Sequence, residues 1–391
     1  MIDPRHLLAG PFARAMVTNL LFFASLNGYV LLPLYVVRLG GTEAAIGLVQ
    51  GMYSAAGIVC QPLVGLWLDR LGRRFFMLVG VTALTVSSAA FIVSASIPLF
   101  AILRALHGVA FSTFFVANYI HVVEMVPVAQ RGWALGIYGL AGLSATALAP
   151  LLAEFVIRNF GFPASFFVST LFAGGALGIV YRSRDARPPT PGAGPGAEEI
   201  REGLRELRRL HNALAFFFGL GTGTVFTFLP TFGEELGVKG LGLFYTAYAG
   251  AAILVRLFGG QLADTRGRRA VIMPSMFIQA SATMILTLIA ASVTRRMPTP
   301  VLPFLALAGL LAGGAHGLLY PALSALVMDV TPERRRGPAV GIYSSVFLVG
   351  NAMGSIVFGY VAHGLGYAVM WGALTAILGV GFAWSFRLRT V

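Results

Sequence analysis

Long apolar runs separated by short polar loops dominate this sequence. A helix needs about 20 apolar residues to cross a bilayer, and charge-free runs of that length recur along the whole chain. The run 75–103 is too long for one span and contains Ser96-Ile97-Pro98, which predicts the end of one helix and the start of the next. A turn at 363–366 separates the last two helices. We therefore predict an all-α integral membrane protein with twelve transmembrane helices, at 15–37, 44–68, 75 to about 96, about 98 to 123, 133–157, 163–181, 211–232, 240–262, 270–293, 301–328, 338–361 and 367–386.

The composition supports a bilayer environment and excludes a soluble globular protein. Hydrophobic residues make up 57% of the chain and charged residues 11%, with a mean hydropathy of +0.81, whereas soluble domains are about a quarter charged. The net charge of +13 does not indicate nucleic-acid binding, because the bases lie in short loops beside apolar runs. Placing both termini in the cytoplasm puts 21 of the 28 bases on that side. We predict this orientation, in the cytoplasmic (inner) membrane.

A break in the apolar pattern divides the chain into two halves. Residues 188–196 are rich in proline and glycine, which predicts a flexible linker. Residues 198–210 follow, with apolar side chains at helical spacing, and are expected to form either a short amphipathic helix on the membrane surface or a solvated charged tether. We predict an N-terminal six-helix half at 1–181, a cytoplasmic linker at 182–209 and a C-terminal six-helix half at 210–391.

The two halves share an internal duplication. Residues 65–74 return as 260–269 with five of ten positions identical, and residues 131–138 return as 336–343 with six of eight identical. The first pair is 195 residues apart and the second is 205 residues apart. Each copy of the first pair lies between two apolar runs, which predicts a tight basic loop joining two membrane helices. The chain therefore consists of two internal repeats, each corresponding to one half of the molecule.

The duplicated loop has the pattern Gly-x-x-x-Asp-x-x-Gly-Arg-Arg, between the second and third helices and again between the eighth and ninth. This pattern resembles the signature loop of the major facilitator superfamily, and the resemblance covers the chain outside the linker. It implies two six-helix repeats with a solute site near mid-bilayer between them, and transport by alternating access. It also implies a small-molecule substrate, no cofactor, contact with membrane lipids and action as a monomer.

The resemblance implies that the loop residues form a latch at the inner gate. In the family, the loop aspartate caps or pairs across the cytoplasmic face, and the arginines meet an acid at the end of the fourth or tenth helix. Glu124 and Asp329 supply those acids, and they are 205 residues apart. The alternative is that the arginines only fix orientation in the membrane. The predicted latch consists of Gly65, Asp69, Arg70, Gly72, Arg73, Arg74 and Glu124, and of Gly260, Asp264, Arg266, Gly267, Arg268, Arg269 and Asp329.

Ionisable residues inside spans are costly and therefore candidates for function. Arg104 and Gly108 resemble the family's fourth-helix arginine motif, which is associated with proton coupling. Glu154, on the fifth helix, lies at a depth only about 5 Å from that of Arg104, from a rise of about 1.5 Å per residue. We predict a coupling group of Arg104, His107 and Glu154, with a static pair joining two helices as the alternative.

Polar and aromatic residues on one face of the fourth helix predict a cavity wall. His107, Phe111, Phe114, Asn118 and His121 recur at steps of four and three. A polar seam between packed helices is the alternative. A histidine pair with no third ligand at useful spacing does not indicate a metal site. The predicted substrate cavity comprises Asn27, Phe111, Phe114, Asn118, Thr222, Tyr245, His316, Tyr320 and Asn351.

These features favour a secondary active transporter for a small organic solute, and proton-coupled efflux of an amphipathic or aromatic compound is the first choice. Uptake or exchange of a small, anionic metabolite is the alternative, because Arg104 is present and the first helix lacks the carboxylate that drug antiporters often carry. The fifth helix also departs from the antiporter pattern, since Ala149-Pro150 keeps the proline without flanking glycines. An intramembrane enzyme is the remote alternative, and no His-Glu-x-x-His or Gly-x-Ser-x-Gly motif supports it.

Overall fold

A computed structural model describes residues 10–127, 131–183, 210–259, 262–297, 300–331 and 336–388, and the predicted surface helix at 198–210 therefore lies almost entirely outside the described residues. All regular structure in these ranges is helical. The elements are α2 (Pro11–Asn27), η1 (Gly28–Leu31), α3 (Leu32–Arg38), α4 (Glu43–Leu71), α5 (Arg73–Val93), α6 (Ile97–Glu124), α7 (Arg131–Phe160), α8 (Phe162–Arg182), α10 (Leu210–Glu235), α11 (Gly242–Gly259), α12 (Leu262–Thr265), α13 (Arg269–Thr294), α14 (Val301–Asp329) and α15 (Arg336–Ser385).

The twelve predicted spans are confirmed. Ten helices of the described chain are long and apolar enough to cross a membrane, and Gly242–Phe258 is a shorter apolar helix. One of the ten contains two spans, because α15 is interrupted at Gly366, where φ is 79°. The turn predicted at 363–366 is therefore wrong in extent, since a single residue breaks the helix. Glycine adopts this left-handed conformation without a Cβ penalty, which makes so short a break possible.

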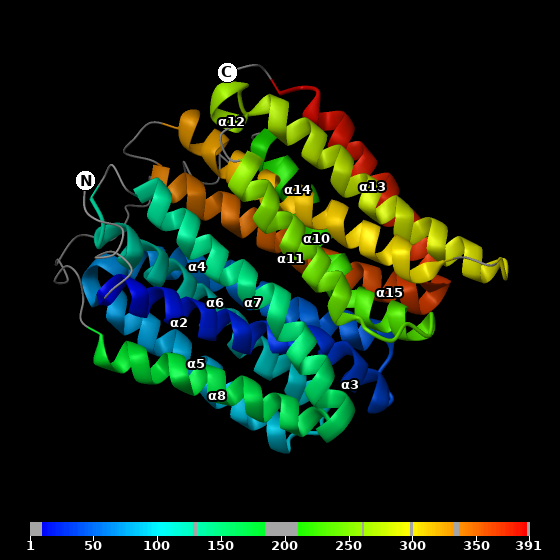
Figure 1. The fold of residues 1–391 in the computed structure, drawn as a ribbon, viewed down its shortest axis with the longest axis horizontal. Helices are drawn as coiled ribbons and strands as arrows, with labels where there is room; N and C mark the ends of the chain where they lie inside the picture. The colour runs from blue at the N-terminus through cyan, green and yellow to red at the C-terminus, as the bar shows by residue number, and fades with distance from the viewer. Residues whose placement is uncertain are drawn as a thin grey trace.

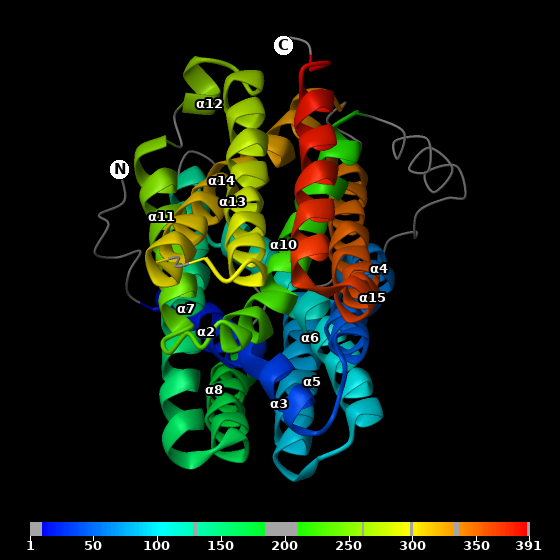
Figure 2. The ribbon, with the colours of Figure 1, turned by 90° about the vertical axis from the view of Figure 1, so that its right-hand side faces the viewer.

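The helices form two bundles that lie side by side (Figures 1 and 2). Elements α2 to α8 form the N-terminal half, and α10 to α15 form the C-terminal half. Figure 1 shows both chain ends at the same end of the molecule. We call this the termini end, and the turns that follow α3, α5, α7, α10 and α13 lie at the opposite end.

The duplication is visible in the packing of the helices. Gly108 of α6 lies against the backbone carbonyl of Tyr53 on α4, and Gly313 of α14 lies against that of Tyr248 on α11. The glycines are 205 residues apart and the tyrosines 195, the same offsets as in the sequence repeats. A Cβ atom at either glycine would overlap the carbonyl group. Equivalent residues thus make equivalent close contacts in both halves.

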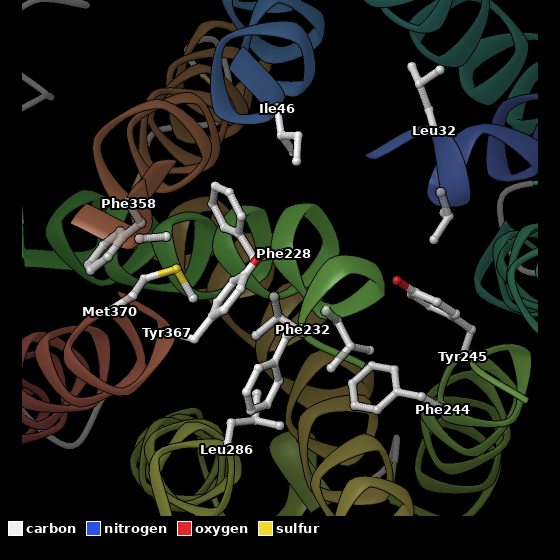
Figure 3. Close-up of a cluster of buried hydrophobic side chains, with 14 of the residues drawn as sticks. Leu32, Ile46, Phe228, Phe232, Phe244, Tyr245, Leu286, Phe358, Tyr367 and Met370 are labelled. Atoms are coloured by element: carbon white, nitrogen blue, oxygen red, sulfur yellow. The ribbon is translucent and has the colours of Figure 1, made fainter. Parts of the chain in front are cut away.

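The hydrophobic core joins the halves at one end only. The largest cluster of buried apolar residues draws on both halves near the opposite end, and Figure 3 shows Ile46 of the N-terminal half above Phe228 of the C-terminal half. A small cluster of Leu31, Ala153 and Leu241 also joins them there. Towards the termini end, each cluster of described residues belongs to a single half. Burial of apolar surface therefore holds the halves together at the opposite end.

Candidate functional site

The most extensive contacts between the two halves form two seams, each made by one helix from either half, and α10 also contacts η1, α3 and α4. At the first seam, α4 packs against the part of α15 before Gly366, where glycines let the two backbones approach closely. A Cβ atom added to Gly47 would overlap the Ser355 carbonyl and lie 3.1 Å from the Cα atom of Gly359. At the second seam, α7 packs against α11. We call these the α4–α15 seam and the α7–α11 seam.

Polar contacts cross the α4–α15 seam at two heights. Midway along the helices, the Ser54 hydroxyl donates a hydrogen bond to Asn351 Oδ1 at 2.8 Å. Asn351, which the sequence assigns to the cavity, thus joins the two halves. At the opposite end, His363 Nδ1 lies 3.2 Å from Glu43 Oε2. The first contact is partly buried and the second is exposed to solvent.

Glu154 reaches across the α7–α11 seam, and its hydrogen bonds and ion pair in the described structure are with residues other than its predicted partner Arg104. Its carboxylate accepts hydrogen bonds from three consecutive backbone N–H groups at the start of α11, and it pairs with Arg158 one turn further along α7. The rise per residue fixes the depth of a side chain but not the direction in which the helix points it. The donors are the N–H groups of Gly240 at 3.0 Å, Leu241 at 3.2 Å and Gly242 at 2.7 Å.

Arg104 is a buried cation without an acidic partner among the described residues. Its guanidinium lies 4.8 Å from the centre of the Tyr53 ring, and Nη1 is 3.4 Å from Nδ1 of His107. The His107 ring packs edge-on against Tyr29, with 4.5 Å between ring centres. Of the predicted coupling group, the structure therefore brings Arg104 and His107 together and places Glu154 elsewhere. The cation is stabilised by a ring face and an imidazole, and its charge is not neutralised.

The predicted stripe on the fourth helix divides between two environments. Phe111 is half-buried and lies near Tyr53 of α4 and Phe115 of its own helix, with ring centres 5.7 and 5.2 Å apart. Phe114 instead stacks on Phe22 at 4.0 Å inside the core of the N-terminal half. The assignment of Phe114 to the cavity wall is thus wrong. We call Tyr53, Phe111 and Phe115 the N-terminal aromatic wall.

Asn118 and His121 also turn away from the centre of the molecule. Both side chains are buried and line a cavity of about 460 Å³ within the N-terminal half at the termini end. The predicted place of Asn118 in a cavity between the halves is therefore not supported. The other residues around this cavity are Pro11, Arg14, Ala15, Thr18, Met77, Met125, Val180, Arg182 and Ser183.

A second aromatic wall lies on the C-terminal half. His316 and Tyr320 of α14 are half-buried, and their parallel rings lie 6.3 Å apart. Phe218 and Tyr248 pack against His316 with ring centres 5.1 and 5.6 Å away. Arg256 donates from Nε to a backbone carbonyl of α14 at 3.3 Å and, like Arg104, forms no ion pair with a described acid. We call His316, Tyr320, Phe218 and Tyr248 the C-terminal aromatic wall.

One tyrosine beyond the N-terminal aromatic wall lies close to the C-terminal aromatic wall. Tyr119, two turns beyond Phe111 on α6, is close enough to Tyr320 of α14 to interact with it electrostatically. The sequence prediction missed Tyr53, Phe115, Phe218 and Tyr248. The 195-residue offset between Tyr53 and Tyr248 is a signal that could have identified two of them.

The remaining predicted cavity residues satisfy their hydrogen bonds locally or lie in the core. Asn27 Nδ2 donates to the Phe23 carbonyl of its own helix at 2.8 Å, and the Thr222 hydroxyl donates to the Phe218 carbonyl at 3.0 Å. Tyr245 is fully buried in the cluster that joins the two halves (Figure 3). Its assignment to an open cavity is therefore wrong in this conformation.

The duplicated loops carry equivalent ion pairs. Arg73 Nη2 lies 2.8 Å from Glu124 Oε1, and Arg268 Nε lies 2.8 Å from Asp329 Oδ2. Each pair joins two helices of the same half. Neither of these two pairs crosses between the halves, so they do not themselves close an inner gate in this conformation, and the inner-gate latch stays a prediction.

The other loop residues have individual roles in the local structure. Gly72 and Gly267 adopt φ values of 87° and 85°, which explains glycine at both positions. Gly65 has no neighbouring side chain within 4 Å of an added Cβ atom, and Arg266 is exposed. Gly260 and the side chains of Asp69 and Asp264 lie outside the described structure. The remaining contacts are Arg74 Nη2 to the Tyr181 carbonyl at 2.7 Å, Arg70 over the Trp67 ring at 5.4 Å, and Arg269 Nε to Met273 Sδ at 3.1 Å.

Comparisons with known proteins identify the family. The family model described as Major Facilitator Superfamily matches residues 15–293 and 212–391. The staphylopine export protein of Staphylococcus aureus is 22% identical over 379 residues, which cover 93% of this chain and 92% of that protein. The multidrug resistance protein MdtG of Salmonella choleraesuis is 26% identical over 354 residues, 86% of this chain and 84% of that protein.

A solved structure shows the same fold. A point mutant of the nucleoside transporter NupG superposes with a TM-score of 0.79 at 15% identity, covering 97% of this chain and 100% of that one. Together with the twelve apolar spans, these matches make the protein a multi-pass membrane transporter of small molecules and not an enzyme. The chain belongs to the Major Facilitator Superfamily.

Proposed function

We propose that this protein exports an amphipathic or aromatic organic compound across the cytoplasmic membrane by alternating access, driven by protons. The observation that carries the proposal is the pair of aromatic walls, one on each half, at the level where the halves are no longer joined by a shared core. A solute held between them would touch both moving bodies at once. Such a solute can respond to and drive their relative motion.

The chemistry of the walls supports the substrate class. Aromatic rings offer large apolar faces with some polarity at their edges, and they bind planar or cationic groups well. The hydroxyls of Tyr53 and Tyr320 add a few polar groups that can orient a solute without demanding one pattern of hydrogen bonds. Two relatives of this chain are named for export of staphylopine and for multidrug resistance. Both names agree with outward transport of organic compounds.

The conformation is consistent with loading from the side that the termini face. The halves are joined by a shared core and by hydrogen bonds at the opposite end. With both termini in the cytoplasm, as the charge bias predicts, this is the state in which an exporter takes up its solute. Within the described spans, His107 beside Arg104 and the carboxylate of Glu154 are the groups of the predicted coupling set that can gain or lose a proton.

A second candidate, uptake or exchange of a small anion, is favoured by two arginines. Arg104 and Arg256 are buried or partly buried cations, and neither forms an ion pair with an acid of the described chain. A buried charge without a partner is costly, so an anionic solute would be attracted to either guanidinium. Exchange of an anion would not require a proton gradient.

Counterflow and efflux in proteoliposomes, with and without an imposed pH gradient, test both candidates. An aromatic amine and an aromatic carboxylate of similar size serve as probes. Gradient-driven movement of the amine that falls severalfold in Phe111→Ala supports the first proposal. The control is Phe167→Ala, the same substitution at an exposed position of α8, which should leave the rate unchanged. Gradient-independent exchange of the carboxylate, lost in Arg104→Gln, supports the second. Equal rates in empty and protein-containing vesicles for both probes would refute both.

A further inference from the structure

We propose that Glu154 is a gating residue, whose carboxylate closes the opposite end of the transport path by binding the N-terminus of α11. The inference rests on the transporter function proposed above and assigns to Glu154 a role other than pairing with Arg104. A carboxylate of the N-terminal half thus serves as the helix cap of the C-terminal half. We call this contact the Glu154 latch.

The geometry of the latch is that of a charged helix cap. The first N–H groups of a helix have no partner within the helix, and the N-terminus carries partial positive charge. The Glu154 carboxylate accepts from three consecutive N–H groups there, at 3.0, 3.2 and 2.7 Å. Its side chain is 12% exposed. Hydrogen bonds to a charged group that is largely withdrawn from water are among the stronger polar contacts in proteins.

The latch exists only while the opposite end is closed. Glu154 belongs to α7 and the donors belong to the turn that begins α11, so every one of the three bonds crosses between halves. If the halves rock apart as bodies, all three must break together. Arg158 lies on the same helix as Glu154 and is half exposed. It can keep the carboxylate paired after separation, which makes the contact reversible rather than a permanent lock.

The other seam, formed by the equivalent helices, carries a weaker polar contact at the same end. There Glu43 begins α4 and pairs with His363 on α15. The side chains are 33% and 52% exposed, and a contact so open to water stabilises little. The two seams are therefore held unequally, and the Glu154 latch is expected to dominate the polar contribution to closure.

Labelling of a buried cysteine from outside tests the latch without any substrate. Cys60, the single cysteine, is replaced by serine, and Leu32→Cys provides a reporter within the cluster that joins the halves. A membrane-impermeant maleimide is applied to the opposite end. Glu154→Gln should label at least about tenfold faster than its parent, because loss of one hydrogen bond to a charged group shifts an equilibrium by roughly that factor or more.

Three comparison variants separate the latch from other effects. Arg158→Gln keeps the three backbone hydrogen bonds and should label within about threefold of the parent, as should Glu43→Gln at the exposed seam. Glu154→Asp keeps the charge but shortens the side chain, so its labelling rate should lie between those of the parent and Glu154→Gln. If Glu154→Gln is not recovered as a monodisperse protein, the labelling rate of Glu154→Asp tests the latch in its place. Parental labelling rates in both Glu154 variants would overturn the latch. Absence of transport in the parent would instead refute the proposed function and leave the latch result standing.

Discussion

Replacing Glu124 by glutamine should destabilise this protein far more than replacing Asp329 by asparagine. The two acids occupy equivalent places in the duplicated halves, and each forms a 2.8 Å ion pair with an arginine of the signature loop. The pairs differ in burial. The Arg73 and Glu124 side chains are 9% and 10% exposed, whereas those of Arg268 and Asp329 are 22% and 41% exposed.

The difference in burial sets the expected magnitudes. Removing one partner of a buried ion pair leaves the other charge uncompensated and costs about 3 to 5 kcal/mol. A glutamine can still accept one hydrogen bond from Arg73, so we expect about 2 to 3 kcal/mol for Glu124→Gln. An exposed pair contributes about 0.2 to 1 kcal/mol. The expected ratio of the two costs is therefore at least about two.

Thermal unfolding of the purified protein in one detergent measures the two costs. Each variant is heated, and the fraction that remains monodisperse is followed by size-exclusion chromatography. Glu124→Gln should lower the midpoint by several degrees, and Asp329→Asn by much less. Equal shifts would refute the reasoning, since they would mean that burial of the pair does not decide its strength. Because each pair lies within a single half and does not cross between the halves, neither variant should alter labelling of the Leu32→Cys reporter.

Two other predictions follow from the seams and the loops. Gly47→Ala should destabilise the closed α4–α15 seam by about 1 to 3 kcal/mol, because the added methyl group overpacks it. Labelling of the Leu32→Cys reporter should therefore be faster, although alanine has the better helix propensity. The matched change Gly174→Ala, where an added Cβ atom meets nothing within 4 Å, should be neutral or stabilising by up to about 1 kcal/mol. Asp69→Asn should lower transport turnover much more than membrane insertion, measured as transport per molecule of inserted protein. Full turnover in that variant would exclude a role for Asp69 in the transport cycle.

The fold could be predicted from the sequence because its determinants are local. Each span is an apolar run of sufficient length, and hydropathy needs no knowledge of neighbouring helices. The partners Glu124 and Asp329 could also be anticipated, because the repeat offsets align them with the loop arginines. The short break at Gly366 was harder to predict, since a helix can restart after one glycine in a left-handed conformation.

The candidate site was less predictable because it depends on how the helices are rotated. The stripe from His107 to His121 has a period of 3.5 residues, and on a helix of 3.6 residues per turn it drifts by about 20° per heptad. Neighbouring members three residues apart also differ by about 60° around the helix, so Phe111 belongs to the aromatic wall while Phe114 packs in the core. Glu154 illustrates the same limit, since its depth was predictable and its partner helix was not.

Because the two repeats are offset by 195 residues at one place and by 205 at another, the two halves differ in length and charge at the opposite end. The ten-residue difference between 195 and 205 lies mainly in the third helix of the C-terminal half and the turn after it, because α13 has 26 residues and α5 has 21. Five residues add about 7.5 Å of helix, and Figure 1 shows this segment extending past the other turns at the opposite end. It carries Arg295 and Arg296, both exposed. One rim of the opposite end thus bears a raised pair of positive charges, which attracts anions and repels cations arriving from that side. If the exported compound proposed above is a cation, the same extension that breaks the symmetry of the repeat would repel the released cation and discourage its return.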